Sequence, residues 1–377
     1  MPERRPLLDA FPALADATPF ARLGTFPTPV TSLSAVAEAM GRPGDAFFEK
    51  RDDRTSPIYG GNKVRTIEVL FGHALKRGMT HVFSTGAYGS NHAAAMAMHA
   101  PRVGLASGIC VYPQPPSPSA LENLELVLSR RPRPLVTDLP HWSALPYGMV
   151  KTAIACRAKG IDAYIMMPGG AVPLGALGYV SAGLELAEQV GAGELAMPET
   201  VVVAVGSNCT SAGLLVGLRL AAILGIGFPP NSQPPRLVSV RVTPWPVTTP
   251  LRILGLARRT SELLAELTGE RHLELDRHTL GSRFSLETGY LGPGYGFATE
   301  RGRRAVALWG EHGGHPLETT YSAKAAAHVL DLVRRGDRGP TVFWVTKSSA
   351  ELPDVDPADL GWAPRRMRRW MDGVRRS

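Results

Sequence analysis

Cysteine is scarce in this chain. Cys110, Cys156 and Cys209 are the only three among 377 residues, and they lie far apart in the sequence. That spacing excludes a zinc knuckle and the disulfide framework typical of small secreted proteins. We therefore expect reduced thiols, no metal centre and a cytoplasmic protein.

Long apolar runs are also missing. Residues 1–17 lack the continuous apolar core of a secretory signal peptide. The most apolar stretch, residues 201–226, is interrupted by Gly206-Ser207-Asn208 and contains Arg219, which excludes a membrane span. The hydrophobic fraction is nonetheless 44%, enough in a chain of this length to bury a large core. This composition predicts one large or two ordinary folded domains and no membrane partner.

The chain is moderately basic. Its 41 Lys and Arg against 33 Asp and Glu give a formal net charge of +8. Such a charge indicates nucleic acid only where it gathers on one functional surface. Much of the excess lies in Arg365-Arg366-Met367-Arg368-Arg369-Trp370, which we interpret as a solvated helix face or tail. We therefore expect no nucleic-acid partner.

Short apolar runs alternate with longer helical patterns over most of the chain. The strand candidates are rich in Val, Ile or aromatic residues and lie at residues 81–84, 108–112, 162–167, 200–205, 237–242 and 341–345. The helix candidates between them lie at residues 63–77, 91–99, 120–129, 178–189, 211–224, 260–268, 300–311 and 322–335. This alternation predicts an α/β fold of largely parallel sheets covered by helices on both faces.

A glycine turn and a lysine open the first long helix candidate, in Gly60-Gly61-Asn62-Lys63-Val64-Arg65. The two glycines permit turns that other residues avoid, and Lys63 then lies at a helix start. The positive end of the helix dipole disfavours an ammonium there, which favours the neutral amine. A neutral amine is what Schiff-base chemistry needs. An ordinary surface lysine after a turn is the alternative.

A second polar turn, Ser84-Thr85-Gly86-Ala87-Tyr88-Gly89-Ser90-Asn91-His92, runs from a strand candidate into a helix candidate. Ligands of parallel α/β proteins bind at the carboxyl ends of the strands, where this turn would lie. Free amides at the helix start suit a carboxylate, and Ser90 and Asn91 offer neutral hydrogen bonds. Plain N-capping by Ser90 is the alternative.

A third turn, Gly206-Ser207-Asn208-Cys209-Thr210-Ser211-Ala212-Gly213, follows a strand candidate directly. Small residues and hydroxyls before a helix form an anion-binding turn, most simply for a phosphate. No lysine follows as in a P-loop, and the spacing is not GxGxxG, so a nucleotide is poorly supported. A bare strand-to-helix connection is the alternative. Together, the lysine, the carboxylate turn and the phosphate turn are what an enzyme needs to hold pyridoxal phosphate and an amino acid.

These motifs are similar to those of a known family. The sequence resembles the 1-aminocyclopropane-1-carboxylate deaminase and D-cysteine desulfhydrase family of pyridoxal-phosphate enzymes, within the tryptophan synthase β-like (fold type II) group. The resemblance covers roughly residues 27–346. It rests on segments in the family's order, which are Glu49-Lys50-Arg51-Asp52-Asp53, residues 60–65, Gly89-Ser90-Asn91-His92, Pro168-Gly169-Gly170 with residues 173–179, residues 206–213, Gly294-Tyr295-Gly296 and Thr320-Tyr321-Ser322-Ala323-Lys324.

The resemblance implies two domains, each an open, twisted, mostly parallel sheet flanked by helices, with the cofactor in the cleft between them. Residues 1–65 and 176–377 would form the large cofactor-binding domain, and residues 66–175 the small domain. Family members are commonly homo-oligomeric, so we expect a homodimer. The only other expected binding partner is a small amino-acid substrate.

The resemblance also implies the roles of individual residues. Lys63 would form the Schiff base with pyridoxal 5'-phosphate, and Asn91 would hydrogen-bond the cofactor's phenolic oxygen. Ser90 would meet the substrate carboxylate and help to handle protons. The other implied site residues are Tyr295 and Tyr321 for catalysis, Gly206, Ser207, Asn208, Cys209, Thr210, Ser322 and Thr346 for the cofactor, and Asn91, His92 and Tyr295 for the substrate.

Two positions separate activities within the family. Ser322 falls where a residue meets the pyridine nitrogen, and members that open the cyclopropane ring carry Glu there. A hydroxyl holds a ring proton less well than a carboxylate, which suits β-elimination of a good leaving group. Thr346 also matches the desulfhydrases. We therefore expect a lyase that converts a small amino acid such as D-cysteine into pyruvate, sulfide and ammonia. Ring-opening deamination, β-replacement and a non-enzymatic binder are the alternatives.

The chain departs from the family pattern at several places, among them Ala171-Val172, where a Ser-Asn pair is common, and the tail beyond about residue 352. Asn208-Cys209 replaces the usual Gly-Gly of the phosphate turn, which narrows the conformations open to it. Lys347-Ser348 replaces the glycines after Thr346, and we expect bulk and charge close to the cofactor's ring. These departures leave cofactor binding as the expectation and the identity of the substrate open.

Overall fold

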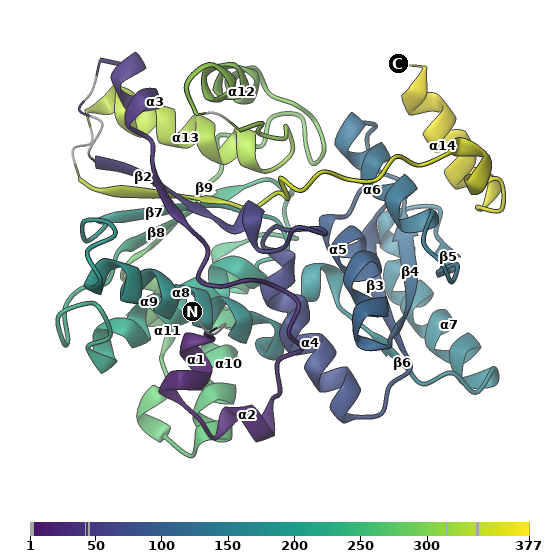
Figure 1. Cartoon of the computed structure of the whole chain (residues 1–377), viewed down its shortest axis with the longest axis horizontal. Helices are drawn as coiled ribbons and strands as arrows, with labels where there is room; N and C mark the ends of the chain where they lie inside the picture. The colour runs from purple at the N-terminus through teal and green to yellow at the C-terminus, as the bar shows by residue number, and fades with distance from the viewer. Residues whose placement is uncertain (1–3, 42, 44–45, 314, 337–338, 377) are drawn as a thin grey trace.

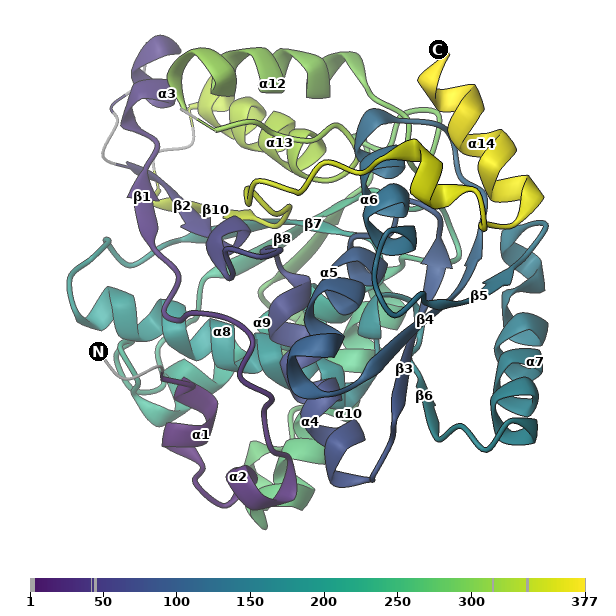
Figure 2. The ribbon, with the colours of Figure 1, turned by 45° about the vertical axis from the view of Figure 1, so that its right-hand side comes forward.

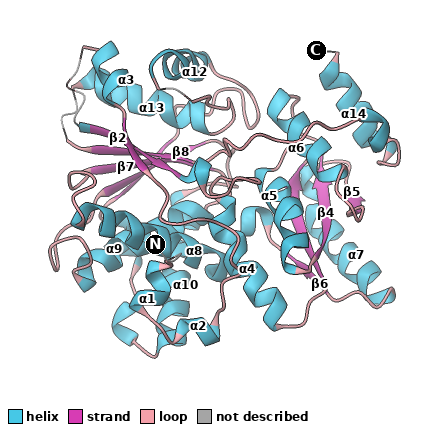
Figure 3. Cartoon of the chain, in the orientation of Figure 1, coloured by secondary structure: helices cyan, strands magenta, loops and turns pink. Residues whose placement is uncertain are grey.

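Two separate sheets, each enclosed by helices, make up the computed structural model, which describes residues 4–41, 43, 46–313, 315–336 and 339–376 (Figures 1 and 3). The larger sheet contains, in spatial order, β1 (Val30–Ser32), β2 (Phe47–Arg51), β10 (Thr341–Val345), β7 (Thr200–Val205), β8 (Arg236–Arg241) and β9 (Phe284–Glu287). Only the β1–β2 pair is antiparallel among these. The smaller sheet is parallel throughout, in the order β5 (Leu135–Asp138), β4 (Ala106–Tyr112), β3 (His81–Ala87) and β6 (Ala163–Ile165).

Helices cover both faces of the large sheet (Figure 1). One face carries α8 (Pro173–Gly191), α9 (Cys209–Leu224) and α10 (Pro250–Thr268), and the other carries α3 (Ser34–Ala39), α12 (Glu300–His312) and α13 (Ser322–Arg335). The strand β7, Thr-Val-Val-Val-Ala-Val, is buried along its whole length because helices lie on both sides of it. The predicted α/β class is therefore confirmed.

The small sheet is enclosed in the same way (Figure 2). Its helices are α5 (Asn91–His99), α6 (Pro118–Leu128) and α7 (Leu145–Ala158). The helix α4 (Lys63–Lys76) joins the two halves, since it packs against both α5 and α8. The shorter helices are α1 (Pro6–Ala10), α2 (Leu14–Ala17) and α11 (Arg277–Gly281). Among the described residues, no helix is long and apolar enough to cross a membrane.

The basic C-terminal segment forms the helix α14 (Arg365–Arg375). Its arginines are exposed, as a solvated face requires, but Met367 and Met371 are buried in the core of the small half. The chain thus returns from the large sheet to pack against α6 (Figure 2). The division into residues 1–65 with 176–377 and residues 66–175 stays a prediction, and α14 lies on the small sheet's side of it.

Strand prediction failed where charges are buried. The strand β2 begins with Phe47 and Phe48 but continues with the charged Glu49, Lys50 and Arg51, and it was not predicted. The edge strands β1, β5 and β9 were also missed, because three or four half-exposed residues carry no clear alternation. Two predicted strands, residues 200–205 and 341–345, have the bounds that the structure gives to β7 and β10.

A buried ionic cluster fixes the start of α4. Arg65 donates hydrogen bonds to Asp52 at 2.7 Å and to Glu185 at 2.8 Å, and Lys50 Nζ lies 2.6 Å from the same Glu185 oxygen. Tyr179 adds a hydrogen bond to Asp52. Two cations and two anions therefore balance within the interior, as buried charges require. The cluster ties α4 to β2 and α8, two residues away from Lys63.

Candidate active site

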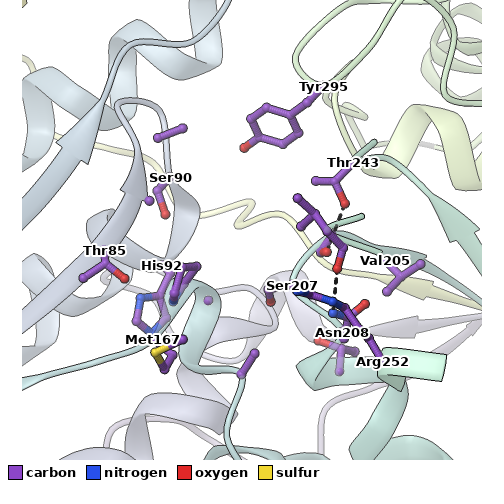
Figure 4. Close-up of a pocket in the computed structure, with 18 of the residues that line it drawn as sticks. Thr85, Ser90, His92, Met167, Val205, Ser207, Asn208, Thr243, Arg252 and Tyr295 are labelled. Carbon is purple, nitrogen blue, oxygen red and sulfur yellow. Dashed lines mark hydrogen bonds between the residues drawn. The ribbon is translucent and has the colours of Figure 1, made fainter. Parts of the chain in front are cut away.

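A cavity of about 1010 Å³ lies where the carboxyl ends of the two parallel sheets face each other. This is the location that the topology of parallel α/β proteins favours for ligands. Figure 4 shows Ser90, His92 and Thr85 on one side of it and Tyr295, Thr243 and Asn208 on the other. Most of the predicted site residues line it, namely Lys63, Ser90, Asn91, His92, Gly206, Ser207, Asn208, Thr210, Tyr295 and Tyr321.

Lys63 is the first residue of α4 and extends into this cavity. Burial lowers the pKa of its ammonium. No carboxylate pairs with it among the described residues, so the loss of water around a charge outweighs the opposing effect of the nearby Cys209 thiol. The preceding Asn62 donates from Nδ2 to Thr210 Oγ1 at 3.0 Å. The lysine turn is thereby joined to the turn at residues 206–213.

The turn at residues 84–92 caps a helix and also lines the cavity. Ser90 caps α5, since its Oγ accepts a hydrogen bond from the Ala93 amide, and the same residue lines the cavity. Asn91 is oriented by two donors, because Oδ1 accepts from Tyr59 Oη at 3.1 Å and from Asn123 Nδ2 at 2.8 Å. Its Nδ2 group is therefore left to donate into the cavity.

His92 is a buried, neutral imidazole at the wall of the cavity. Burial and the neighbouring Lys63 lower its pKa to about 3. Nδ1 lies 2.8 Å from Ser84 Oγ, whereas Nε2 has no hydrogen-bond partner among the described residues. Nε2 faces the backbone at Gly170, where a Cβ would lie 3.3 Å from it, so His92 contributes to the wall that packs against the Pro168-Gly169-Gly170 segment.

The turn before α9 presents unpaired amides. The amides of residues 207–211 donate to no other described group, as is normal for the start of a helix, and the side chains of Ser207 and Thr210 lie beside them. Asn208 adopts a left-handed conformation at φ 75° and donates from Nδ2 to the Val247 carbonyl at 3.0 Å. Asparagine tolerates this region better than most residues, so the turn keeps a shape that glycine would adopt.

Two tyrosines face the sheet ends from the large half. Tyr295 and Tyr321 share a hydrogen bond of 2.8 Å between their hydroxyls. Burial raises the pKa of both phenols. They therefore remain protonated at neutral pH and act as hydrogen-bond donors.

Comparison with known proteins decides what this arrangement holds. Residues 21–347 match the family model described as "Pyridoxal-phosphate dependent enzyme". The chain belongs to this family. It is 32% identical over 358 residues to a D-cysteine desulfhydrase of Klebsiella pneumoniae (strain 342), covering 90% of this chain and 98% of that protein. It is also 32% identical over 309 residues to nocardicin C-9' epimerase of Nocardia uniformis subsp. tsuyamanensis, covering 81% and 87%.

The solved structures agree with the sequence comparison. A crystal structure of an ACC deaminase homologue superposes with a TM-score of 0.71 at 27% identity, covering 92% of this chain and 95% of that one. The resemblance to the ACC deaminase and D-cysteine desulfhydrase family is thus confirmed, and with it the dependence on pyridoxal phosphate. The cavity fits this cofactor: it offers an unpaired lysine amine, free amides at a helix start for a phosphate, and the oriented Nδ2 group of Asn91.

Three predicted cofactor residues do not line the cavity. Cys209 is buried beneath the turn, with Sγ 3.2 Å from the Gly170 carbonyl, and burial raises the pKa of its thiol. Ser322 begins α13, and its hydroxyl lies within hydrogen-bonding distance of the Glu318 carbonyl and carboxylate. Thr346 accepts the Asn62 amide at its carbonyl. Their roles toward the cofactor stay predictions.

The expectation that Lys347 lies close to the cofactor's ring stays a prediction. Its ammonium lies 3.4 Å from Tyr59 Oη and Asn123 Oδ1 and 3.5 Å from Glu122. Lys347 therefore supports the two side chains that orient Asn91.

Several residues of the site escaped the sequence interpretation. Tyr59 and Asn123 are remote from each other in the sequence, and no local signal marks them as partners of Asn91. Gly169 packs directly on the phosphate turn, because a Cβ there would approach Ser207 Oγ to 2.2 Å, and its φ is 64°. The Pro168-Gly169-Gly170 segment was visible in the sequence, but its contact with residue 207 was not.

Proposed function

We propose that this protein is a pyridoxal-phosphate-dependent lyase that performs α,β-elimination on an amino acid with a good leaving group, D-cysteine being the reference substrate. The products are pyruvate, sulfide and ammonia, with one water consumed. The observation that carries the proposal is the unpaired amine of Lys63 in a cavity that also contains the free amides before α9.

The side chains around the cavity have separate roles toward the cofactor and the substrate. Lys63 would hold the cofactor before the substrate amine displaces it, and the cofactor would then supply the electron withdrawal from the substrate's Cα. The amides of residues 207–211 and the hydroxyls of Ser207 and Thr210 hold its phosphate, and Asn91 Nδ2 donates to its phenolic oxygen. Ser90 Oγ and the α5 amides orient the substrate carboxylate.

Proton transfer falls to groups of suitable pKa. Lys63 is the first choice as the base at Cα, because burial favours its neutral form, and Ser90 is the rival on the other turn. The paired phenols of Tyr295 and Tyr321 are protonated donors positioned in the same cavity. The family resemblance places Ser322, and not a carboxylate, at the pyridine nitrogen, which favours elimination over opening of a cyclopropane ring, although its hydroxyl lies against Glu318 in this structure.

The test is a panel of D- and L-amino acids, including D-cysteine and 1-aminocyclopropane-1-carboxylate, assayed for release of 2-oxo acid. We expect release from D-cysteine to exceed release from the cyclopropane. Lys63→Ala should lose at least about a thousandfold in turnover, together with the visible absorbance of lysine-bound cofactor. Lys76→Ala, at the other end of α4, is the matched control and should retain both. An active Lys63→Ala variant would refute the assignment, and faster consumption of the cyclopropane would reassign the reaction.

Epimerisation at Cα is a second candidate, favoured by the match to nocardicin C-9' epimerase. Lys63 and Ser90 both line the cavity, so two groups are available to remove and return a proton. Elimination and epimerisation separate in deuterium oxide: an eliminating enzyme releases 2-oxo acid, whereas an epimerase returns the opposite enantiomer with deuterium at Cα.

We also place the protein in the cytoplasm as a homodimer. Its three cysteines are free and buried, which supports a reducing compartment.

The apolar side chains of Tyr147, Val150 and Ile154 are exposed along one side of α7, which supports contact with a second copy. Light scattering of the purified protein tests the dimer, and a monomer would refute it.

A further inference from the structure

The cavity extends well beyond the residues that would hold the cofactor and a cysteine. Its volume, about 1010 Å³, lies at the upper end of the range for pockets that enclose drug-sized ligands. The additional lining comes from the segment after β8, from α10 and α11, and from the segments after β5 and β6 on the small half.

One wall of this extension is basic. Arg252 and Arg259 lie two turns apart on α10, and Arg277 is the first residue of α11. The guanidinium groups of Arg259 and Arg277 converge over Gly255, since a Cβ built there would lie 3.6 and 3.7 Å from one nitrogen of each. Figure 4 shows Arg252 beside Asn208, at the end of this wall next to the phosphate turn.

Within the described ranges none of these three arginines forms an ion pair. The adjacent Arg258, by contrast, pairs with Glu262. Converging guanidinium groups repel each other and favour an anion between them. The arrangement therefore points to a negatively charged group of a bound molecule.

The rest of the extension is apolar and exposed. Trp142, Leu145 and Met167 come from the small half, and Trp245, Val247 and Leu251 come from the large half. The two tryptophans are 63% and 74% exposed, which is unusual for so large an apolar side chain unless it contacts a ligand or partner. A ligand that extends from the cofactor site to the arginines lies in the cavity that these side chains line.

We propose that the site takes amino acids whose β-substituent is long, with an apolar or aromatic body and an anionic end that binds Arg259 and Arg277. This inference rests on the proposed function, since it describes the leaving group of that same elimination. Trp142 and Trp245 contact the apolar body of the β-substituent, and the two arginines determine its preferred length and charge.

The test compares two S-substituted cysteines, each as D and L enantiomer: S-(4-carboxybenzyl)cysteine and the neutral S-(4-methylbenzyl)cysteine. Elimination breaks the Cβ–S bond, the sulfur leaves as the thiol, and water releases pyruvate and ammonia. We expect a kcat/KM that is about tenfold higher for the carboxylate, mostly through KM. The double variant Arg259→Gln with Arg277→Gln should abolish this preference while leaving turnover of D-cysteine unchanged.

Arg258→Gln is the matched control, because Arg258 lies on the same helix but does not line the cavity. It should keep the preference for the carboxylate. Equal kcat/KM values for the two wild-type substrates, or loss of the preference in Arg258→Gln, would overturn the inference. If the double variant instead loses cofactor absorbance, the arginines hold the cofactor's phosphate, and the inference is equally overturned.

A binding measurement separates this inference from the proposed reaction. In 2-amino-5-(4-carboxyphenyl)pentanoic acid a methylene replaces the sulfur, so no group can leave. Calorimetry with this compound and its methyl counterpart should show the same charge preference, about tenfold in Kd, lost in the double variant. A preference in binding without elimination from any cysteine would refute the proposed function alone. Elimination from D-cysteine without a preference in binding would refute the inference alone.

Discussion

Two enclosed lysines, thirteen positions apart in the sequence, have opposite surroundings. Lys50 is fully buried and contacts Glu185, the Thr28 carbonyl and Gln189. Lys63 lies at the wall of a large cavity and has no carboxylate partner in the described part of the chain. Burial lowers the pKa of both, but at Lys50 the adjacent Glu185 opposes that effect. One lysine holds the fold together, and the other is available for chemistry.

A residue's presence in a family motif does not by itself decide what the residue does. Both lysines belong to segments that resemble the same enzyme family. The surroundings separate them, because a buried ion pair stabilises only while both partners are present, whereas an unpaired amine in a cavity is a nucleophile and a base.

The largest expected effect on stability is at the first lysine. Lys50→Met leaves the buried cluster with one excess negative charge, and we expect a loss of about 3–5 kcal/mol in the free energy of unfolding. Lys63→Met should change the same quantity by less than about 1 kcal/mol, since it removes an unpaired group. Urea unfolding of the cofactor-free proteins measures both.

A second variant shows whether charge balance is the cause. Lys50→Met combined with Glu185→Gln restores neutrality and should recover part of the lost free energy of unfolding. A double variant no more stable than Lys50→Met would show that packing around Lys50, and not its charge, distinguishes the two regions.

A smaller effect depends on pH and lies on the cavity side. The pKa of His92 falls from an ordinary 6.5 to about 3 on folding. Between these values the unfolded chain binds the proton and the folded one does not, so stability falls as pH decreases below 6.5, by up to about 1.4 kcal/mol per pH unit. From pH 7 to pH 5, His92→Asn should lose about 2 kcal/mol less than the unsubstituted protein.

Urea unfolding at pH 7 and pH 5 measures how much the free energy of unfolding changes in each protein. His278→Asn, at an exposed position of α11, is the control and should follow the unsubstituted protein. If His92→Asn and the unsubstituted protein lost the same free energy of unfolding between the two pH values, His92 would be protonated at pH 5 in the folded state. The His92 ring beside Lys63 would then be less buried than the structure indicates.

The smallest effect concerns the backbone of the phosphate turn. Asn208→Ala places an ordinary side chain at φ 75° and removes the hydrogen bond to Val247, so we expect a loss of about 1–2 kcal/mol and weaker cofactor binding. Asn208→Gly removes the same hydrogen bond but relieves the left-handed strain, and should lose less than about 1 kcal/mol. Equal losses for Ala and Gly would show that the hydrogen bond alone matters. Unfolding curves and cofactor titration give the two readouts.

Local sequence predicted much of this site. The Ser90-Asn91 turn and the turn at residue 206 combine small residues with a predicted strand-to-helix transition, the lysine turn places two glycines before a predicted helix, and all three reach the cavity. The reason is topological: carboxyl ends of parallel strands face the same way, so turns that follow them converge.

What lay beyond local sequence depends on contacts between distant residues. Glu49 accepts a hydrogen bond from Trp309 and Lys50 pairs with Glu185, so a strand of charged residues is stable only in the context of partners far along the chain. The position of the Lys347 ammonium, beside Tyr59, Asn123 and Glu122, depends on remote partners in the same way.

By itself, then, the sequence determined the α/β class, the cofactor family and the lysine, since periodicity, turn chemistry and short motifs are local properties. Only the tertiary structure decided which lysine has no carboxylate partner among the described residues, that Asn91 Oδ1 already accepts hydrogen bonds, and that Arg259 and Arg277 converge on one wall. Burial and charge pairing arise when remote segments meet, and they set the chemistry of each group.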